Sequence, residues 1–161
     1  MAFCPGKKGD AVNGAVWDRD LGADLAAIRD WGATALVSLT EDHEFDLLQV
    51  PGLGEQAAAM GIEWHHLPIA DMNIQDAGFD TLWTCSGHVL RRRLQAGEKI
   101  VIHCRGGLGR TGTIAAKLLI EFGMVPEEAM RQVRAARPGA IEGALQPRYV
   151  MAQKPHLPTA G

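Results

Sequence analysis

The 161-residue sequence has few cysteines, few aromatic residues and no strong excess of charge of either sign. Its three cysteines, Cys4, Cys85 and Cys104, are too few and too scattered for a disulfide framework or a zinc finger. The net charge of −3 argues against a nucleic-acid-binding protein, which usually carries a basic stripe. No apolar run reaches the ~18 residues that span a bilayer, and the N-terminus has no apolar signal core. We therefore expect a cytoplasmic protein with reduced thiols that binds neither nucleic acid nor membrane.

The size and composition fit a single globular unit. A chain of 161 residues matches the usual length of one domain and can bury a core without disulfides. Hydrophobic residues make up 47% and charged residues 22%, which is ordinary for such a domain. We predict that residues 1–161 form one domain, and we expect a monomer.

Segments with helical spacing alternate with short apolar segments along the chain. We predict strands at residues 35–39, 62–68 and 99–103, and helices at residues 21–31, 51–60, 79–94, 111–122, 126–136 and 143–154. The first 15 residues, residues 40–44 and residues 69–78 are predicted to be loops, strand 99–103 is apolar enough to be central, and Cys85 should pack in the core. The pattern predicts an α/β fold with a central, mainly parallel sheet flanked by helices on both faces. Ligands of such sheets bind beyond the carboxyl ends of the strands.

The turn between strand 99–103 and the next helix carries the chemistry. Glycines at 106, 107 and 109 let the backbone curl so that successive N–H groups face inward, and such a nest at a helix N-terminus binds an anion. Arg110 can add a two-point contact to two phosphate oxygens. Cys104, at the rim of this positive cradle, should be held as a thiolate. We predict Cys104 as the nucleophile, Arg110 as the phosphate clamp, and a phosphate cradle made of Arg105, Gly106, Gly107, Leu108 and Gly109.

The residues beside Cys104 have supporting roles in this interpretation. The Thr111 hydroxyl is expected to hydrogen-bond the sulfur, and the His103 ring to bond loop carbonyls; direct proton transfer is the alternative for His103. An inert, buried core cysteine is the competing interpretation of Cys104. The ordered run of His, Cys, three glycines, Arg and Thr between a strand and a helix argues against it. The turn is not a Walker A loop, because the P-loop lysine is missing.

The run HCRGGLGRTGT resembles the HCxxGxxR[ST] signature of the protein tyrosine and dual-specificity phosphatases. The resemblance extends from about Trp17 to Gln153. WHHLPIAD is similar to the matching stretch of kinase-associated phosphatase, and SLTEDHE and RPGAIE are similar to the small atypical dual-specificity phosphatases. It implies a dual-specificity phosphatase-like fold, no metal or cofactor, and cleavage of phosphate monoesters through a phosphocysteine intermediate.

The resemblance also implies further site residues. The family's general acid is an aspartate some 30 residues before the cysteine, which corresponds to Asp71, with Asp76 as the alternative. Classical tyrosine phosphatases have a water-orienting glutamine where this chain has Glu142; a helix-start glutamate favoured by the dipole is the alternative interpretation of Glu142. Gln146 matches the family's second glutamine.

A further acidic loop, with Glu41, Asp42 and Glu44, lies at the same predicted sheet edge. We favour a solvated loop there. The alternative is that one of these carboxylates forms a salt bridge with Arg110 or Arg105.

The sequence thus favours a phosphatase of phosphotyrosine, with phosphoserine and phosphothreonine as open substrates and a kinase as one candidate target. Phosphate-like oxyanions should bind in the same site. The rivals are a phosphatase of phosphoinositides or small molecules, a non-catalytic phosphate-binding module, and sulfur transfer or arsenate reduction. A cradle with Arg105 and no lysine weakly favours a phosphoprotein over a lipid phosphate.

Overall fold

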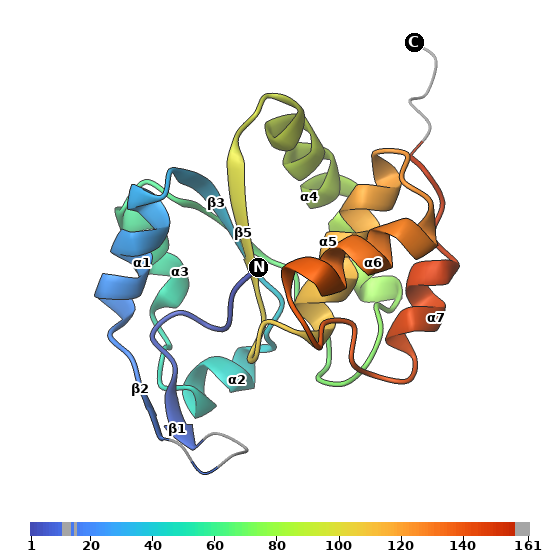
Figure 1. Ribbon diagram of the computed structural model, residues 1–161. Coiled ribbons are helices and arrows are strands. Elements are labelled where there is room, and N and C mark those ends of the chain that lie inside the picture. The colour runs from blue at the N-terminus through green and yellow to red at the C-terminus, as the bar shows by residue number, and fades with distance from the viewer. Residues whose placement is uncertain (11–13, 15, 157–161) are drawn as a thin grey trace.

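The computed structural model describes residues 1–10, 14 and 16–156 (Figure 1). In chain order these residues form β1 (Lys8–Asp10), β2 (Val16–Asp18), α1 (Leu21–Asp30), β3 (Ala33–Ser38), α2 (Asp42–Leu47), α3 (Leu53–Ala59), β4 (Glu63–His66), α4 (Ala77–Gln95), β5 (Lys99–His103), α5 (Gly109–Glu121), α6 (Pro126–Ala136) and α7 (Gln146–Met151). The predicted domain and N-terminal loop also include residues 11–13, 15 and 157–161, which lie outside the described residues.

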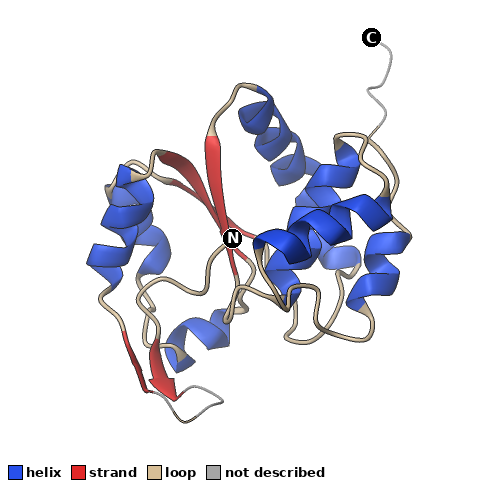
Figure 2. Cartoon of the chain, in the orientation of Figure 1, coloured by secondary structure: helices blue, strands red, loops and turns tan. Residues whose placement is uncertain are grey.

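A parallel sheet of three strands, in the order β4-β3-β5, runs through the middle of the molecule (Figure 2). Val37 of β3 lies opposite His65 of β4 and Ile102 of β5. The central strand is therefore β3, and the prediction that residues 99–103 are central is wrong. β5 is nevertheless well covered, because the N-terminal segment lies along its free edge and the Ala2 N–H donates to the Ile102 carbonyl at 2.9 Å.

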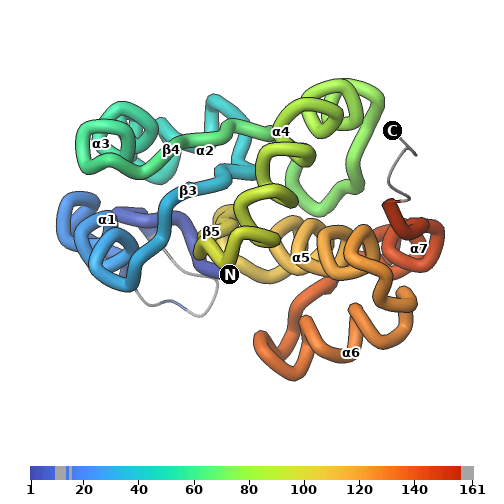
Figure 3. The backbone as a smooth tube through the Cα atoms, turned by 90° about the horizontal axis from the view of Figure 1, so that it is seen from above, coloured from blue at the N-terminus to red at the C-terminus, as the bar shows by residue number. Residues whose placement is uncertain are grey.

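Helices cover both faces of this sheet. Side chains alternate along each strand, so Leu36 and Val101 enter one hydrophobic cluster while Val37 and Ile102 enter another. The first cluster lies under α1 and α3, and the second lies under α4 and α5, on the opposite face (Figures 1 and 3). The predicted α/β fold with helices on both faces is confirmed.

The last two helices add a layer outside α5. Apolar residues of α5 pack against Ala129 and Val133 of α6 and Val150 of α7. α5 is consequently packed on both sides, against the sheet and against α6 and α7, and its first turn is fixed in space. None of the described helices is both long enough and apolar enough to cross a bilayer.

Two of the predicted loops contain regular structure. β1 and β2 pair antiparallel, with Lys8 opposite Asp18, where the first 15 residues were expected to be loop. The segment after β3 begins α2 at Asp42, where residues 40–44 were expected to be loop. A strand of three residues and a helix of six carry too short a periodic pattern to be detected. Each makes a contact with a distant part of the chain: the Lys8 N–H donates to the Leu48 carbonyl, and Glu44 pairs with Arg110.

Cys85 is exposed, so its predicted place in the core is wrong. Leu82 and Val89, its neighbours on that helical stripe, are also exposed. An adjacent stripe of α4 faces the sheet instead, and it contains Phe79, Trp83, Gly87 and Leu90. Both stripes have helical spacing, and the bulkier aromatic one is buried because it removes more apolar surface from water.

Candidate active site

The turn that follows β5 wraps around the sulfur of Cys104. The Gly107 N–H donates to Cys104 Sγ at 3.2 Å, and Cys104 itself is 3% exposed. Gly107 has φ +73°, and a Cβ atom there would lie 2.4 Å from the Ala2 carbonyl oxygen. Only glycine therefore permits both this backbone conformation and the close approach of the N-terminal segment, which braces the turn from outside.

Arg110, in the first turn of α5, is buried and held by four acceptors. Its Nη1 lies 2.6 Å from Glu44 Oε2, and its Nη2 lies 2.8 Å from Glu44 Oε1. Nη1 also donates to the carbonyl of Ile69 at 3.0 Å and to that of Leu39 at 3.4 Å. The plane of the guanidinium group is thus fixed before any anion arrives, as a two-point phosphate contact requires.

Glu44 is a buried carboxylate and not part of a solvated loop, so the preferred interpretation of residues 41–44 is wrong and the salt-bridge alternative is correct. Burial alone would raise the pKa of Glu44, but hydrogen bonds from Arg110 and from the Glu41 N–H outweigh it and hold that pKa below its usual value. Glu44 becomes buried because β3 and α5 bring its helix against Arg110, a contact that a local pattern cannot show.

Asp71 lies at the same site, on the loop before α4. Its Oδ1 is 3.0 Å from Arg110 Nη2 and also accepts a hydrogen bond from the Met72 N–H. About half of the Asp71 side chain is exposed, so the carboxylate faces the open cleft. Asp76, the alternative acid, caps α4 instead: its Oδ1 accepts from the Phe79 N–H at 2.9 Å.

Glu142 and Gln146 lie over the start of α5. A Cβ atom on Gly109 would be 3.1 Å from Glu142 Oε1 and 2.9 Å from the Gln146 amide, so both side chains approach the turn closely. The Gln146 Oε1 accepts from the Gly143 N–H at 3.1 Å, and its Nε2 donates to the Asn73 carbonyl at 3.3 Å. Gln146 therefore links the Glu142 loop to the loop of Asp71.

His103 is fully buried behind the turn. Its Nε2 is 2.6 Å from Ser38 Oγ, which accepts from Trp64 Nε1, and its Nδ1 is 3.3 Å from the Cys104 carbonyl. This chain of partners fits a neutral ring that accepts at Nε2 and donates at Nδ1. Burial lowers the pKa of His103 to about 4, with the charge of Arg110 acting in the same direction.

Thr111 does not form the predicted hydrogen bond with the sulfur. Its Oγ1 is buried and has no hydrogen-bond partner among the described residues. The direction of a hydroxyl depends on its rotamer, which sequence order does not determine.

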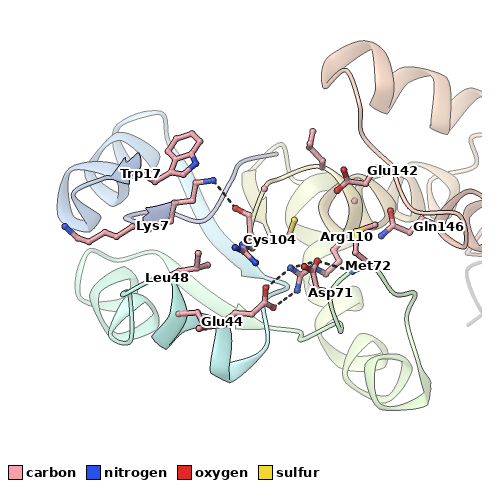
Figure 4. Close-up of a pocket in the computed structure, with 17 residues that line it drawn as sticks. Lys7, Trp17, Glu44, Leu48, Asp71, Met72, Cys104, Arg110, Glu142 and Gln146 are labelled. Atoms are coloured by element: carbon pink, nitrogen blue, oxygen red, sulfur yellow. Dashed lines mark hydrogen bonds and ion pairs between the residues drawn. The ribbon is translucent and has the colours of Figure 1, made fainter. Parts of the chain in front are cut away.

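These residues surround a cleft of about 490 Å³ (Figure 4). The predicted residues that line it are Asp71, Cys104, Arg105, Gly106, Leu108, Gly109, Arg110, Glu142 and Gln146. Three further predicted site residues, His103, Gly107 and Thr111, do not line it. The cleft is also lined by residues that the sequence analysis did not identify, among them Lys7, Trp17, Leu48 and Met72. No local motif marks them, because they come from the N-terminal segment, from β2, from the C-cap of α2 and from the loop before α4.

Comparison with known protein families shows which family the chain belongs to. A family model described as "Swiss Army Knife protein, DSP-PTPase phosphatase domain" matches residues 17–150. The chain belongs to the DSP-PTPase phosphatase family. That match covers the sheet, the Cys104 turn, Asp71 and Glu142. The matched residues therefore include every element that builds the cleft except the N-terminal segment and β1.

Individual relatives and solved structures agree with this family assignment. The chain is 31% identical over 140 residues to human cyclin-dependent kinase inhibitor 3, covering 82% of this chain and 62% of that protein. It is 38% identical over 90 residues to human dual specificity protein phosphatase CDC14C, covering 48% of this chain and 20% of that protein. The chain thus spans about three fifths of the first relative and less of the second.

Among solved structures, kinase associated phosphatase with its catalytic-site cysteine replaced by serine matches with a TM-score of 0.80 at 28% identity. That match covers 92% of this chain and 80% of the other. Tk-PTP in its active form matches with a TM-score of 0.68 at 29% identity, covering 84% and 87%. The described residues contain no cluster of three or more His, Cys, Asp or Glu side chains placed to hold a metal ion.

Proposed function

We propose that the protein hydrolyses phosphate monoesters of phosphoproteins through a phosphocysteine intermediate formed on Cys104. The observation that carries the proposal is the placement of a sulfur, a fixed guanidinium group and a half-exposed carboxylate around one cleft. Membership of the DSP-PTPase family supports it.

In the first step, the phosphate dianion docks in the cradle of residues 105–110. Cys104 Sγ attacks phosphorus, the S–P bond forms, and the P–O bond to the leaving group breaks. Asp71 gives its proton to the leaving oxygen. Arg110 and the inward N–H groups stabilise the equatorial oxygens, where charge is greatest in the transition state.

In the second step, water attacks the phosphocysteine. Asp71, now a carboxylate, takes the proton from water while the S–P bond breaks and inorganic phosphate leaves. Glu142, whose carboxylate lies beside Gly109, orients the attacking water, and Gln146 holds the Glu142 loop against the loop of Asp71. His103 shapes the turn from behind, through Ser38 and the Cys104 carbonyl.

Phosphotyrosine is the proposed main substrate, with phosphoserine and phosphothreonine as further substrates. The relatives named cyclin-dependent kinase inhibitor 3 support a kinase as the phosphoprotein target. A nucleophilic cysteine and two further free cysteines suit a reducing compartment, which supports a cytoplasmic location. We further propose that residues 1–161 act as one catalytic unit and as a monomer, which size-exclusion chromatography tests.

The deciding experiment compares the protein with its Cys104→Ser variant on p-nitrophenyl phosphate and on phosphotyrosine peptides. The parent protein should turn over both, whereas the variant should lose turnover and still bind tungstate, because the cradle is intact. Turnover by the variant would contradict the assignment of the nucleophile. Oxyanion binding without turnover by the parent protein would identify a non-catalytic binding module instead.

A further inference from the structure

Three cationic side chains gather on one side of the turn, around its first two carbonyls. Lys7 Nζ lies 3.4 Å from the Arg105 carbonyl, and Arg137 Nη2 lies 3.3 Å from the Gly106 carbonyl, while the exposed side chain of Arg105 lines the cleft. None of the three forms an ion pair with a carboxylate among the described residues. By contrast, Lys8 is paired with Asp18 at 2.6 Å.

Lys7 is the most unusual of these cations, because it is only 7% exposed. Its ammonium group lies 3.8 Å from the centre of the Trp17 ring and 4.9 Å from that of Phe3, and the two rings contact each other. The rings hold the amine in place and compensate part of its lost hydration. An ammonium group has three N–H donors, and a single carbonyl at 3.4 Å leaves most of this capacity unused.

Lys7 lies on the side of Cys104 away from the other proposed catalytic groups. In Figure 4, Lys7 and Trp17 lie on one side of Cys104, and Asp71 and Glu142 lie on the other. The scissile phosphate has its own partners, which are the N–H groups of the turn and Arg110. The unused charge of Lys7 is therefore available to a second negative group at the edge of the same cleft.

We propose that Lys7, with Arg105 beside it, forms a second anion subsite that binds the carboxylate or phosphate of a residue next to the phosphorylated residue of a peptide substrate. This inference rests on the proposed function and narrows its substrate class to acidic or doubly phosphorylated sites. Burial is the main cause that lowers the pKa of Lys7; the charges of Arg105 and Arg137 act in the same direction, while Cys4 and Cys104 oppose them. A bound anion would offset the repulsion among the three cations. Lys7 itself precedes residues 17–150, the part of the chain that matches the family, whereas Arg105 lies within that part.

The test uses matched phosphotyrosine peptides with Glu or Gln directly before, and in a second pair directly after, the phosphorylated residue. A third peptide carries phosphothreonine at the flanking position, which distinguishes a carboxylate ligand from a phosphate ligand. In the parent protein, kcat/KM for an acidic or doubly phosphorylated peptide should exceed that for its neutral match by about tenfold, the effect of one charge-assisted hydrogen bond. The ratio should fall towards one as NaCl rises from about 50 mM to about 500 mM.

Variants then assign the ratio to Lys7. Lys7→Met should reduce the ratio of kcat/KM values to near one, and Lys7→Arg should keep most of it. Lys8→Met, which removes a charge that is already paired, should leave the ratio within about twofold of the parent value. A ratio near one in the parent protein would overturn the inference. An equal loss of kcat/KM for the acidic and the neutral peptide in Lys7→Met would also overturn it, because a lysine that only braces the turn affects both peptides alike. If Lys7→Met fails to fold, Lys7→Gln, which keeps a polar side chain without the charge, takes its place in the comparison.

Failure of the proposed function gives a different result. If p-nitrophenyl phosphate is hydrolysed and no peptide is, the phosphoprotein substrate and the subsite are both contradicted. If the peptides are hydrolysed without any preference for the acidic matches, the proposed function stands and the subsite is contradicted.

Discussion

Glu44 and Arg110 are 66 residues apart in the sequence and form a two-point ion pair, with Nη1–Oε2 at 2.6 Å and Nη2–Oε1 at 2.8 Å. Their side chains are 5% and 1% exposed. The pair sets the plane of the guanidinium group at the base of the cleft and joins α2 to the first turn of α5. It therefore connects the stability of the fold to the geometry of the site.

Replacing Glu44 by Gln should destabilise the protein by about 3–5 kcal/mol, because it leaves the buried charge of Arg110 without its main counter-charge. Urea unfolding measures the change. Asp46→Asn, on the exposed side of the same helix, is the matched control and should stay within about 0.5 kcal/mol. Inorganic phosphate should stabilise Glu44→Gln more than the parent protein, since it supplies negative charge beside Arg110. Equal unfolding free energies for parent and variant would show that the pair does not fix Arg110.

Asp71→Asn should lower kcat on a phosphotyrosine peptide by about 10²–10⁴-fold, the usual effect of a general acid. The loss should be smaller on p-nitrophenyl phosphate, because its leaving oxygen needs less protonation. Asp76→Asn is the control, since asparagine also caps a helix, and it should keep near-parent activity. An equal loss on both substrates would argue that Asp71 acts through Arg110 and not as the acid.

Glu142→Ala should slow hydrolysis of the phosphocysteine and leave its formation unchanged. Rapid-mixing experiments with p-nitrophenyl phosphate should then show a larger burst of nitrophenol and a slower steady state. Glu142→Gln keeps a group that can hold water, so it should retain more of the second step. Unchanged burst amplitude and steady-state rate in Glu142→Ala would leave Glu142 without a role in the reaction.

Buried His103 should make stability depend on pH. Its pKa falls from the ordinary 6.5 to about 4 on folding, so between these values the unfolded chain binds the proton and the folded protein does not. The contribution of neutral His103 to the free energy of unfolding is complete above pH 6.5. It is lost as the pH falls towards 4, by about 3 kcal/mol in all. His103→Gln, whose amide oxygen can still accept from Ser38, should be less stable at pH 7 and have a correspondingly shallower loss of unfolding free energy between pH 7 and 4.5. An identical pH slope for parent and variant would show that His103 is not the group responsible.

The parts of the fold that the sequence predicted well are those with a complete local signal. Strand 99–103 and helix 126–136 have the predicted bounds, since one is a continuous apolar run and the other starts at a proline and keeps helical spacing. The β1–β2 hairpin and α2 are too short for such a signal. The exposure of Cys85 depended on which of two equally periodic stripes of α4 met the sheet.

The sequence by itself determined the local structure of residues 103–111, because a strand, a curled glycine turn and a helix start are all set by neighbouring residues. It also determined the family and the layered α/β architecture, which follow from the signature and from the alternation of strands and helices. Only the tertiary structure decided which carboxylate holds Arg110, that Gln146 links two loops, and that Lys7 lies buried beside the turn. Those contacts join segments from 66 to 98 residues apart, and packing, unlike local periodicity, depends on the whole chain.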